Sequence, residues 1–123
     1  MPIIYEIRSD HVFERWLDVV TADEVRAHFL AVLNDPIALR IRRSLVDVRL
    51  TEATFRGSDI SLLVHTIMRP ALEGNPWRSG VVARSALEVG LARQLTLLAA
   101  GVLVLRTFED EESALAWTLS SAD

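Results

Sequence analysis

The polar residues that could do chemistry gather where strand-like stretches of the chain give way to helices. Ser58 could be a nucleophile with His65 as its base, and both belong to one predicted helix. The two lie seven residues apart. At about 1.5 Å of rise per residue, their backbones are then roughly 10 Å apart. A direct hydrogen bond between the side chains is out of reach, so the spacing excludes this nucleophile and base pair.

The other residue types exclude further classes of reaction. The chain has no cysteine, which excludes thiolate nucleophiles and iron–sulfur clusters. None of its 13 basic residues is a lysine, which excludes Schiff-base chemistry. The three histidines lack metal-ligand spacing and are interpreted as surface or partly buried residues, and the glycines form no phosphate-binding cluster. We therefore predict a protein that is not an enzyme, with no catalytic residue, no metal and no cofactor.

Length and charge limit the class of protein. A chain of 123 residues fits one domain, and a net charge of −4 argues against binding nucleic acid. The N-terminal residues show no basic segment followed by an apolar run. The longest uncharged stretch, Gln94–Leu105, is shorter than the roughly 20 apolar residues that span a bilayer. We expect a single cytoplasmic domain over residues 1–123.

Helix-start signals follow the apolar stretches of the chain. Thr21 with Glu24 and Ser85 with Glu88 form two capping boxes, in which a hydroxyl and a carboxylate satisfy free backbone N–H groups. Asp110 and Ser58 are predicted to be simpler caps. The chain therefore alternates between strands and helices.

These signals predict five strands and four helices. The strands are expected at 3–8, 12–20, 44–50, 81–84 and 102–106, and the helices at 21–34, 58–73, 85–100 and 110–119. The first two strands form an antiparallel hairpin, and segment 37–43 stays unassigned because arginines interrupt it. Alternation of strands and helices indicates an α/β fold with a mixed, mostly parallel sheet flanked by helices.

The first candidate site lies in the loop that precedes the second long helix. Its candidate residues are Thr54, Arg56, Ser58 and Asp59. Exposed N–H groups and the helix dipole favour anions at such a strand-to-helix turn. The loop is therefore either a phosphate or phosphorylation site, or a set of ordinary caps and loop polar residues.

The second candidate site is one face of the helix predicted at 85–100. Leu87, Leu91, Leu95 and Leu98 are expected to form its core stripe. The opposite face then carries Val89, Arg93, Leu97 and Ala100. Apolar residues on a solvent face suggest a dimer contact, the entrance for a hydrophobic ligand or a membrane-touching surface, although single exposed aliphatic residues are common.

Three stretches of the chain together resemble a known family. Trp16–Glu24 leads into the first helix, Leu45–Arg49 forms a strand, and Phe108–Trp117 closes the chain. In this order they resemble the SpoIIAA-like group of STAS domains over nearly the full length. The resemblance implies a compact sheet flanked by helices, usually without enzymatic activity.

The same resemblance bears on the first candidate site. Anti-sigma-factor antagonists of the STAS fold carry an Asp-Ser-Ser-Gly sequence at the start of their second helix, and phosphorylation there switches partner binding. This chain has Arg56-Gly57-Ser58-Asp59 in that region, with an aspartate where the usual phosphoacceptor falls. A fixed carboxylate replaces the switch unless Ser58 takes over the role.

Two functions follow as expectations. The first is a non-enzymatic module that binds another protein, with a homodimer as one form. The second, implied by the similarity of this group to the Sec14 lipid-binding fold, is a carrier or sensor of a lipid or other apolar molecule. Such a ligand would lie between the helices predicted at 58–73 and 85–100, or the protein would work at a membrane surface.

Overall fold

A single five-stranded sheet forms the centre of the molecule. The structure is a computed structural model that describes residues 2–121, so Met1, Ala122 and Asp123 of the predicted domain lie outside the described residues. The strands are β1 (Ile3–Ile7), β2 (Val12–Val20), β3 (Arg43–Ala53), β4 (Trp77–Val82) and β5 (Leu103–Phe108). They lie in sequence order across the sheet, with β1 antiparallel to β2 and all other pairs parallel.

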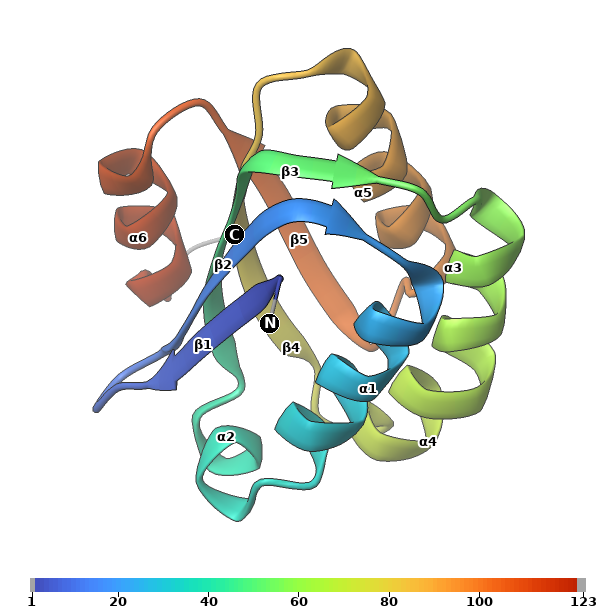
Figure 1. Ribbon diagram of the computed structural model, residues 1–123. Coiled ribbons are helices and arrows are strands. Elements are labelled where there is room, and N and C mark those ends of the chain that lie inside the picture. The colour runs from blue at the N-terminus through green and yellow to red at the C-terminus, as the bar shows by residue number, and fades with distance from the viewer. Residues whose placement is uncertain (1, 122–123) are drawn as a thin grey trace.

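Helices cover both faces of this sheet (Figure 1). The elements are α1 (Ala22–Leu33), α2 (Pro36–Ile41), α3 (Gly57–Leu63), a π-helical segment η1 (Val64–Met68), α4 (Arg69–Leu72), α5 (Ala86–Leu98) and α6 (Glu111–Leu119). In Figure 1, α1, α3, α4 and α5 lie on one side of the sheet and α6 lies on the other. The predicted α/β class, hairpin and mostly parallel sheet are therefore confirmed.

Successive side chains of a strand point to opposite faces of the sheet, and each face has its own core. On β2, Val12, Glu14 and Trp16 are buried, whereas the intervening Phe13 and Arg15 are only partly buried. Val12 and Trp16 belong to the large core, and Phe13 packs on a smaller core around Leu45, Val82 and Ala114 of α6. The period of two along a strand thus assigns each residue to one helical layer.

The predicted capping boxes form. The Thr21 hydroxyl accepts from Glu24 N at 3.3 Å and the Glu24 carboxylate accepts from Thr21 N at 3.0 Å. Ser85 and Glu88 make the same exchange, and Asp110 Oδ1 accepts from Ser113 N at 2.7 Å. Local hydrogen bonding therefore fixes the starts of α1, α5 and α6.

The start of α3 differs from the prediction. Its N-cap is Arg56, and the helix begins at Gly57, so Ser58 lies inside the first turn and is not a cap. Asp59 supplies the local bond instead, since its Oδ2 accepts from Arg56 N at 2.8 Å. A carboxylate at the third helical position replaces the hydroxyl that the sequence suggested.

Two other segments depart from the prediction. The segment that the prediction left unassigned forms α2. Asp35 caps this helix, Pro36 lies in its first turn, and Arg42 ends it with a φ of 54°. The long second helix contains the π-helical segment η1, in which Arg69 N donates to the Val64 carbonyl. Pro70 follows with no N–H to continue the α-helical ladder, which accounts for the disturbed register.

Candidate functional site

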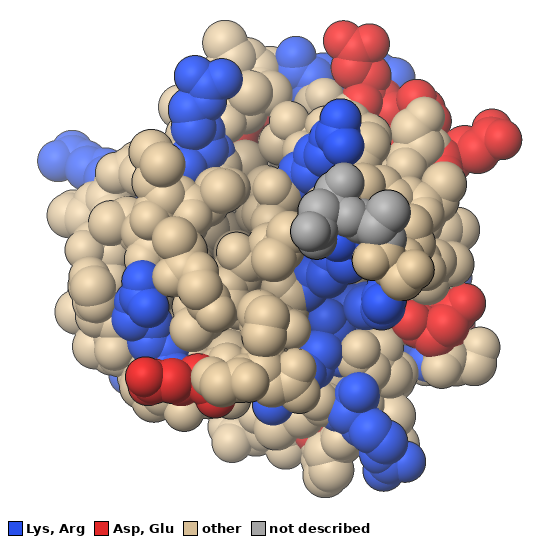
Figure 2. All heavy atoms as spheres, turned by 180° about the vertical axis from the view of Figure 1, so that it is seen from behind, with Lys and Arg blue, Asp and Glu red and all other residues tan. Residues whose placement is uncertain are grey.

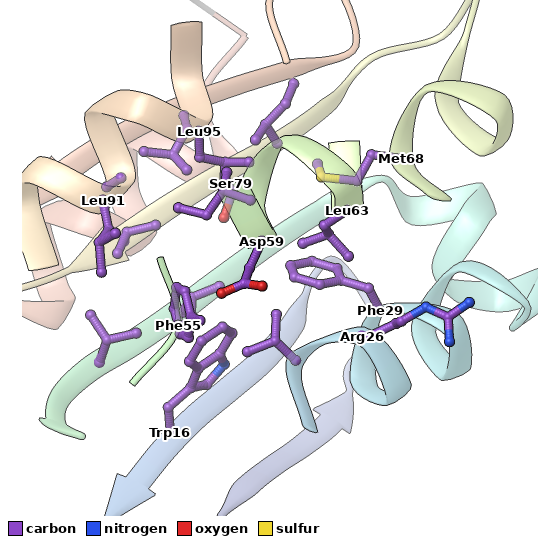
Figure 3. Close-up of a pocket in the computed structure, with 18 of the residues that line it drawn as sticks. Trp16, Arg26, Phe29, Phe55, Asp59, Leu63, Met68, Ser79, Leu91 and Leu95 are labelled. Carbon is purple, nitrogen blue, oxygen red and sulfur yellow. The ribbon is translucent and has the colours of Figure 1, made fainter. Parts of the chain in front are cut away.

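An apolar cavity of about 220 Å³ lies between the sheet and the helices α1, α3 and α5. Figure 3 shows aromatic and aliphatic side chains around it, with Trp16 and Phe55 on one side and Phe29, Leu63 and Met68 on the other. Leu91 and Leu95 of α5 close another wall. An empty apolar cavity of about 150 Å³ is large enough to bind benzene, so this space can hold a small organic molecule.

Short side chains leave the space that the surrounding large ones enclose. Ala22, Ala53 and Ala92 line the cavity, as do Ser44 and Ser79 on the sheet. Around this gap the aromatic rings pack edge to face, with the Trp16 and Phe55 centroids 6.5 Å apart at an angle of 65°. Small residues among large ones, all on elements held by the sheet, give a preformed apolar site.

Glu14 is the most unusual residue of the lining. Its side chain is 3% exposed, although it lies on the apolar side of β2 between Val12 and Trp16. Its Oε1 accepts from Trp16 Nε1 at 3.2 Å, and from His28 Nε2 at 2.7 Å when the imidazole carries its proton on Nε2. Burial of a carboxylate is costly unless donors surround it, and these two N–H groups provide that compensation.

His28 comes from α1 and is also buried, at 6% exposure. The Tyr5 ring meets it edge-on with centroids 5.2 Å apart, and Trp16 and Phe29 rings also contact it. The interpretation of His28 as a surface or partly buried residue was therefore wrong. His11 is likewise buried, at 4% exposure.

Two serines and a tryptophan form a second polar group on the cavity floor. Trp77 Nε1 donates to Ser44 Oγ at 2.9 Å, and the Ser44 and Ser79 hydroxyls lie 3.0 Å apart on neighbouring strands. Both serines are buried. Together with Glu14, they give an otherwise apolar cavity a few fixed hydrogen-bonding groups, as is typical of ligand sites.

Of the first predicted site, only Asp59 reaches this cavity. Its carboxylate points into the space between Phe29 and Phe55 (Figure 3). Thr54, Arg56 and Ser58 are exposed, and the Thr54 hydroxyl donates to the Val20 carbonyl at 3.1 Å. The structure therefore does not bring the four residues to one point. Modification of Ser58 stays a prediction.

Comparison with known proteins identifies the fold. No protein-family model and no curated protein matches the chain. Among solved structures, it is similar to an uncharacterized protein of the DUF3478 family from Shewanella loihica PV-4, which has a SpoIIAA-like fold. The TM-score is 0.60 and the sequence identity 17%, over 94% of this chain and 91% of that chain. The fold is SpoIIAA-like. The expectation from the resemblance is confirmed for the fold.

Within the SpoIIAA-like fold, Val89, Arg93 and Leu97 of the second predicted site lie on α5, whereas Ala100 lies in the turn that follows the helix. Arg93, Leu97 and Ala100 are exposed, with Leu97 at 73%. Val89 does not share that exposure, because it is half-buried and packs against the large core. Leu87 was predicted to be core but is 58% exposed, so the buried stripe of α5 is rotated from the expected one.

The opposite face of the SpoIIAA-like sheet carries a cluster of charges under α6. Asp47 is buried, and Arg49 binds both of its carboxylate oxygens at 3.0 Å. Arg15 lies between Asp47, at 3.4 Å, and Glu111 of α6, at 2.5 Å. Burial alone would raise the pKa of Asp47, but the hydrogen bonds and charge of Arg49, with Arg15, outweigh it and lower the pKa from 3.8 to about 2.

Arginines also bind the end of α6. Figure 2 shows basic side chains gathered in a column on the rear face of the molecule. Arg43 donates to the carbonyls of Thr118 and Ser120, and Arg78 donates to that of Trp117 while its guanidinium lies 3.7 Å from the Trp117 ring centroid. Cations at a helix C-terminus satisfy its free carbonyls and oppose its dipole. These arginines therefore hold α6 on the sheet.

Residues 2–121 hold neither a cluster of metal-binding side chains nor a helix suited to cross a membrane. Nowhere in this range do three or more His, Asp or Glu side chains gather in a way that could hold a metal ion. None of the helices in the same range is long and apolar enough to cross a membrane.

Proposed function

We propose that this protein is a STAS-type binding module that takes up a small, largely apolar molecule in the cavity under α1, α3 and α5. The observation that supports the proposal is the cavity itself, about 220 Å³ in volume and walled by aromatic and aliphatic side chains. A role in binding, without bond-breaking chemistry, agrees with the residue types and with the SpoIIAA-like fold. It develops the carrier or sensor expectation from the sequence.

The size of the site limits the class of ligand. A monocyclic aromatic or short branched aliphatic molecule fits the volume, whereas a whole two-chain lipid does not. Burial of apolar surface contributes about 25 cal/mol per Å², and part of it is lost to the cost of association. Dissociation constants in the range of about 10 μM to 1 mM are therefore expected for molecules of eight or nine heavy atoms.

Titration with ethylbenzene tests the proposal. Trp16 and Trp77 line the cavity, whereas Trp117 lies on the α6 face. In ¹H–¹⁵N NMR spectra the indole N–H signals of Trp16 and Trp77 should shift on titration while that of Trp117 stays in place. Equal small shifts of all three signals, or none, would contradict a site in the cavity.

A cavity-filling variant supplies the matched comparison. Ala92 is buried on the cavity wall, and Ala86 is exposed on the same helix. Ala92→Leu should abolish ethylbenzene binding because its added carbons occupy the space, whereas Ala86→Leu should leave binding unchanged. Native mass spectrometry of the protein purified from its own host would then report any retained ligand.

A second candidate function is the binding of another protein, or of a second copy, through the exposed side of α5. The observation that favours it is the 73% exposure of Leu97, beside the exposed Arg93 and Ala100. Leu97→Asp should reduce self-association, which sedimentation experiments measure. If the face meets a membrane, the substitution should instead reduce the partition of the protein to liposomes. An unchanged sedimentation profile and unchanged partition would remove this surface from consideration.

A further inference from the structure

We infer that the ligand carries a hydroxyl or amino group that donates a hydrogen bond to Glu14. This inference rests on the proposed function, since it names the polar group of a molecule bound in the same cavity. It concerns the chemistry of the ligand and not only its size.

The hydrogen bonds of Glu14 leave one of its oxygens available. Both N–H donors, from Trp16 and His28, bind Oε1, at 3.2 and 2.7 Å. Within residues 2–121, no donor makes a hydrogen bond to Oε2 and no arginine forms an ion pair with this carboxylate. Among residues 2–121, the side-chain atoms that are fully enclosed without a partner are His11 Nε2 and Trp117 Nε1, so Oε2 is accessible from the cavity that Glu14 lines and can accept a hydrogen bond from a molecule bound there.

The partner that Oε2 lacks defines the ligand. A ligand O–H or N–H would satisfy this oxygen, whereas a carbonyl or ether oxygen would place two acceptors together. A ligand carboxylate beside Glu14 would bring two like charges together, so the inferred polar group is a donor and not an anion. The site should therefore prefer a donor over an acceptor of equal shape.

Asp59, Ser44 and Ser79 do not impose this preference, and the other polar residues of the lining within residues 2–121 are exposed or half-buried. Asp59 is half-buried, and its Oδ2 accepts a hydrogen bond from Arg56 N. Water can donate to its other oxygen, so a ligand donor is not required there. Ser44 Oγ donates a hydrogen bond to Ser79 Oγ and accepts one from Trp77 Nε1. Because a hydroxyl can donate as well as accept, these serines can pair with either kind of ligand group. Glu14 is the fully buried lining residue that can discriminate between donor and acceptor.

Three ligands of nearly equal shape test the inference. Ethylbenzene carries no polar group, benzyl alcohol places a donor at the end of its side chain, and benzaldehyde places an acceptor there. Each is titrated into the wild-type protein and into Glu14→Gln, with the Trp16 and Trp77 indole signals as readout. Ratios between the two proteins cancel the different solvation of the three ligands in water.

Glu14→Gln reverses the chemistry while nearly preserving the shape. The amide oxygen can still accept from Trp16 and His28, which turns the amide NH₂ toward the place of Oε2. Benzyl alcohol should bind about tenfold more weakly and benzaldehyde more tightly, as expected for one hydrogen bond to a carboxylate. Ethylbenzene should bind equally to both proteins, which also shows that the variant has folded.

Each result is decisive. If ethylbenzene shifts no cavity signal in the wild-type protein, the proposed function fails and this inference fails with it. If ethylbenzene binds but the benzyl alcohol to benzaldehyde ratio is the same in both proteins, only the inference is overturned. Ser79→Ala is the control, and a loss of the benzyl alcohol preference there, but not in Glu14→Gln, would also overturn it.

A second measurement covers the case in which Glu14→Gln does not fold. The wild-type protein can be crystallised with benzyl alcohol, and the position of its hydroxyl oxygen read directly. We expect that oxygen within hydrogen-bond distance of Glu14 Oε2. A ring in the cavity with its hydroxyl at Ser79 or Asp59 would contradict the inference.

Discussion

On the face of the sheet that α6 covers, Gly80 has no room for one more carbon atom, whereas on the other face an apolar cavity of about 220 Å³ remains. A Cβ at Gly80 would lie 2.3 Å from Thr118 Oγ1 and 2.7 Å from the Ala114 carbonyl oxygen. On the α6 face, the helix packs closely on the sheet and a cluster of charged side chains lies beside it. On the other face, large apolar side chains surround a cavity. One face is therefore suited to stability and the other to binding.

The polar groups of the two faces differ in the same way. Asp47, on the α6 face, receives donors on both oxygens, from Arg49 and Arg15. Glu14, on the cavity face, receives both of its donors on Oε1. Two buried carboxylates on one strand pair thus differ in how completely the protein satisfies them, and the incomplete one lies beside the cavity.

The largest effect is expected for Gly80→Ala. The three nearest atoms that its Cβ would meet belong to α6, two of them to its backbone, so the helix must move away from the sheet. Overpacking of this kind costs about 3 kcal/mol of unfolding free energy. Urea denaturation followed by circular dichroism measures the loss.

Gly57→Ala is the matched control for that experiment. The Cβ added there would meet the side chain of Gln94. That side chain is flexible and exposed, so it can rotate away. Its cost should be below about 1 kcal/mol, since alanine also suits a helix better than glycine. Equal losses for the two variants would contradict the difference in packing between the faces.

Asp47→Asn should have the next largest effect. The substitution removes the charge that Arg49 and Arg15 share and leaves their guanidinium groups partly buried without it. A loss of about 2 kcal/mol in unfolding free energy is expected, because hydrogen bonds to charged groups are worth about that much. Glu111→Gln should cost less, since that side chain is 39% exposed.

The same carboxyl predicts how stability depends on pH. The pKa of Asp47 is about 2 in the folded protein, below its ordinary value of 3.8. A lowered pKa gives stability that is present above 3.8 and is lost as the pH falls from there to about 2. The loss should amount to about 2 kcal/mol, from 1.36 kcal/mol per pKa unit.

Denaturation of the wild-type protein and of Asp47→Asn between pH 5 and 2 measures this contribution. The difference in unfolding free energy between the two proteins should shrink as the pH falls through this window, because protonation of Asp47 then removes the same charge in the wild type. A constant difference across the window would show that Asp47 does not titrate with a lowered pKa.

The sequence predicts the elements whose signals are local. Thr21, Ser85 and Asp110 cap helices because each bond joins residues three apart, which the sequence displays directly. The strands follow from alternation and apolar runs. The start signal of α2 is equally local, since Asp35 accepts from Ala38 N and Pro36 follows the cap, but a helix of six residues is too short to show a helical period.

The helices at 58–73 and 85–100, between which an apolar ligand was expected, both line the cavity, but local signals do not define its volume because side chains from five or more elements enclose it. One signal was available, however. Glu14 stands between Val12 and Trp16 in a predicted strand, so the period of two places it on their buried side. The partner His28 lies on another element, and only the fold brings the two together. The exposed sites of the loop and of α5 could be proposed from sequence, but their use by a partner stays a prediction.

The smallest effect on stability is expected at Ser58, on the helix that bounds the cavity. Because Arg56 and not Ser58 is the N-cap, and Ser58 is exposed, Ser58→Ala should change the unfolding free energy by less than about 0.5 kcal/mol. Asp59→Ala should cost more, about 1 kcal/mol, because it removes the bond to Arg56 N. Denaturation of both variants measures the difference.

This near-neutral substitution separates structure from regulation at the start of α3. If phosphorylation of Ser58 controls a partner, Ser58→Ala will change partner binding with almost no change in stability, which a cap could not do. If Ser58→Ala instead destabilises the protein as much as Asp59→Ala does, the hydroxyl supports the helix after all. In that case a loss of binding would follow from unfolding of the first turn, where the Asp59 carboxylate enters the cavity.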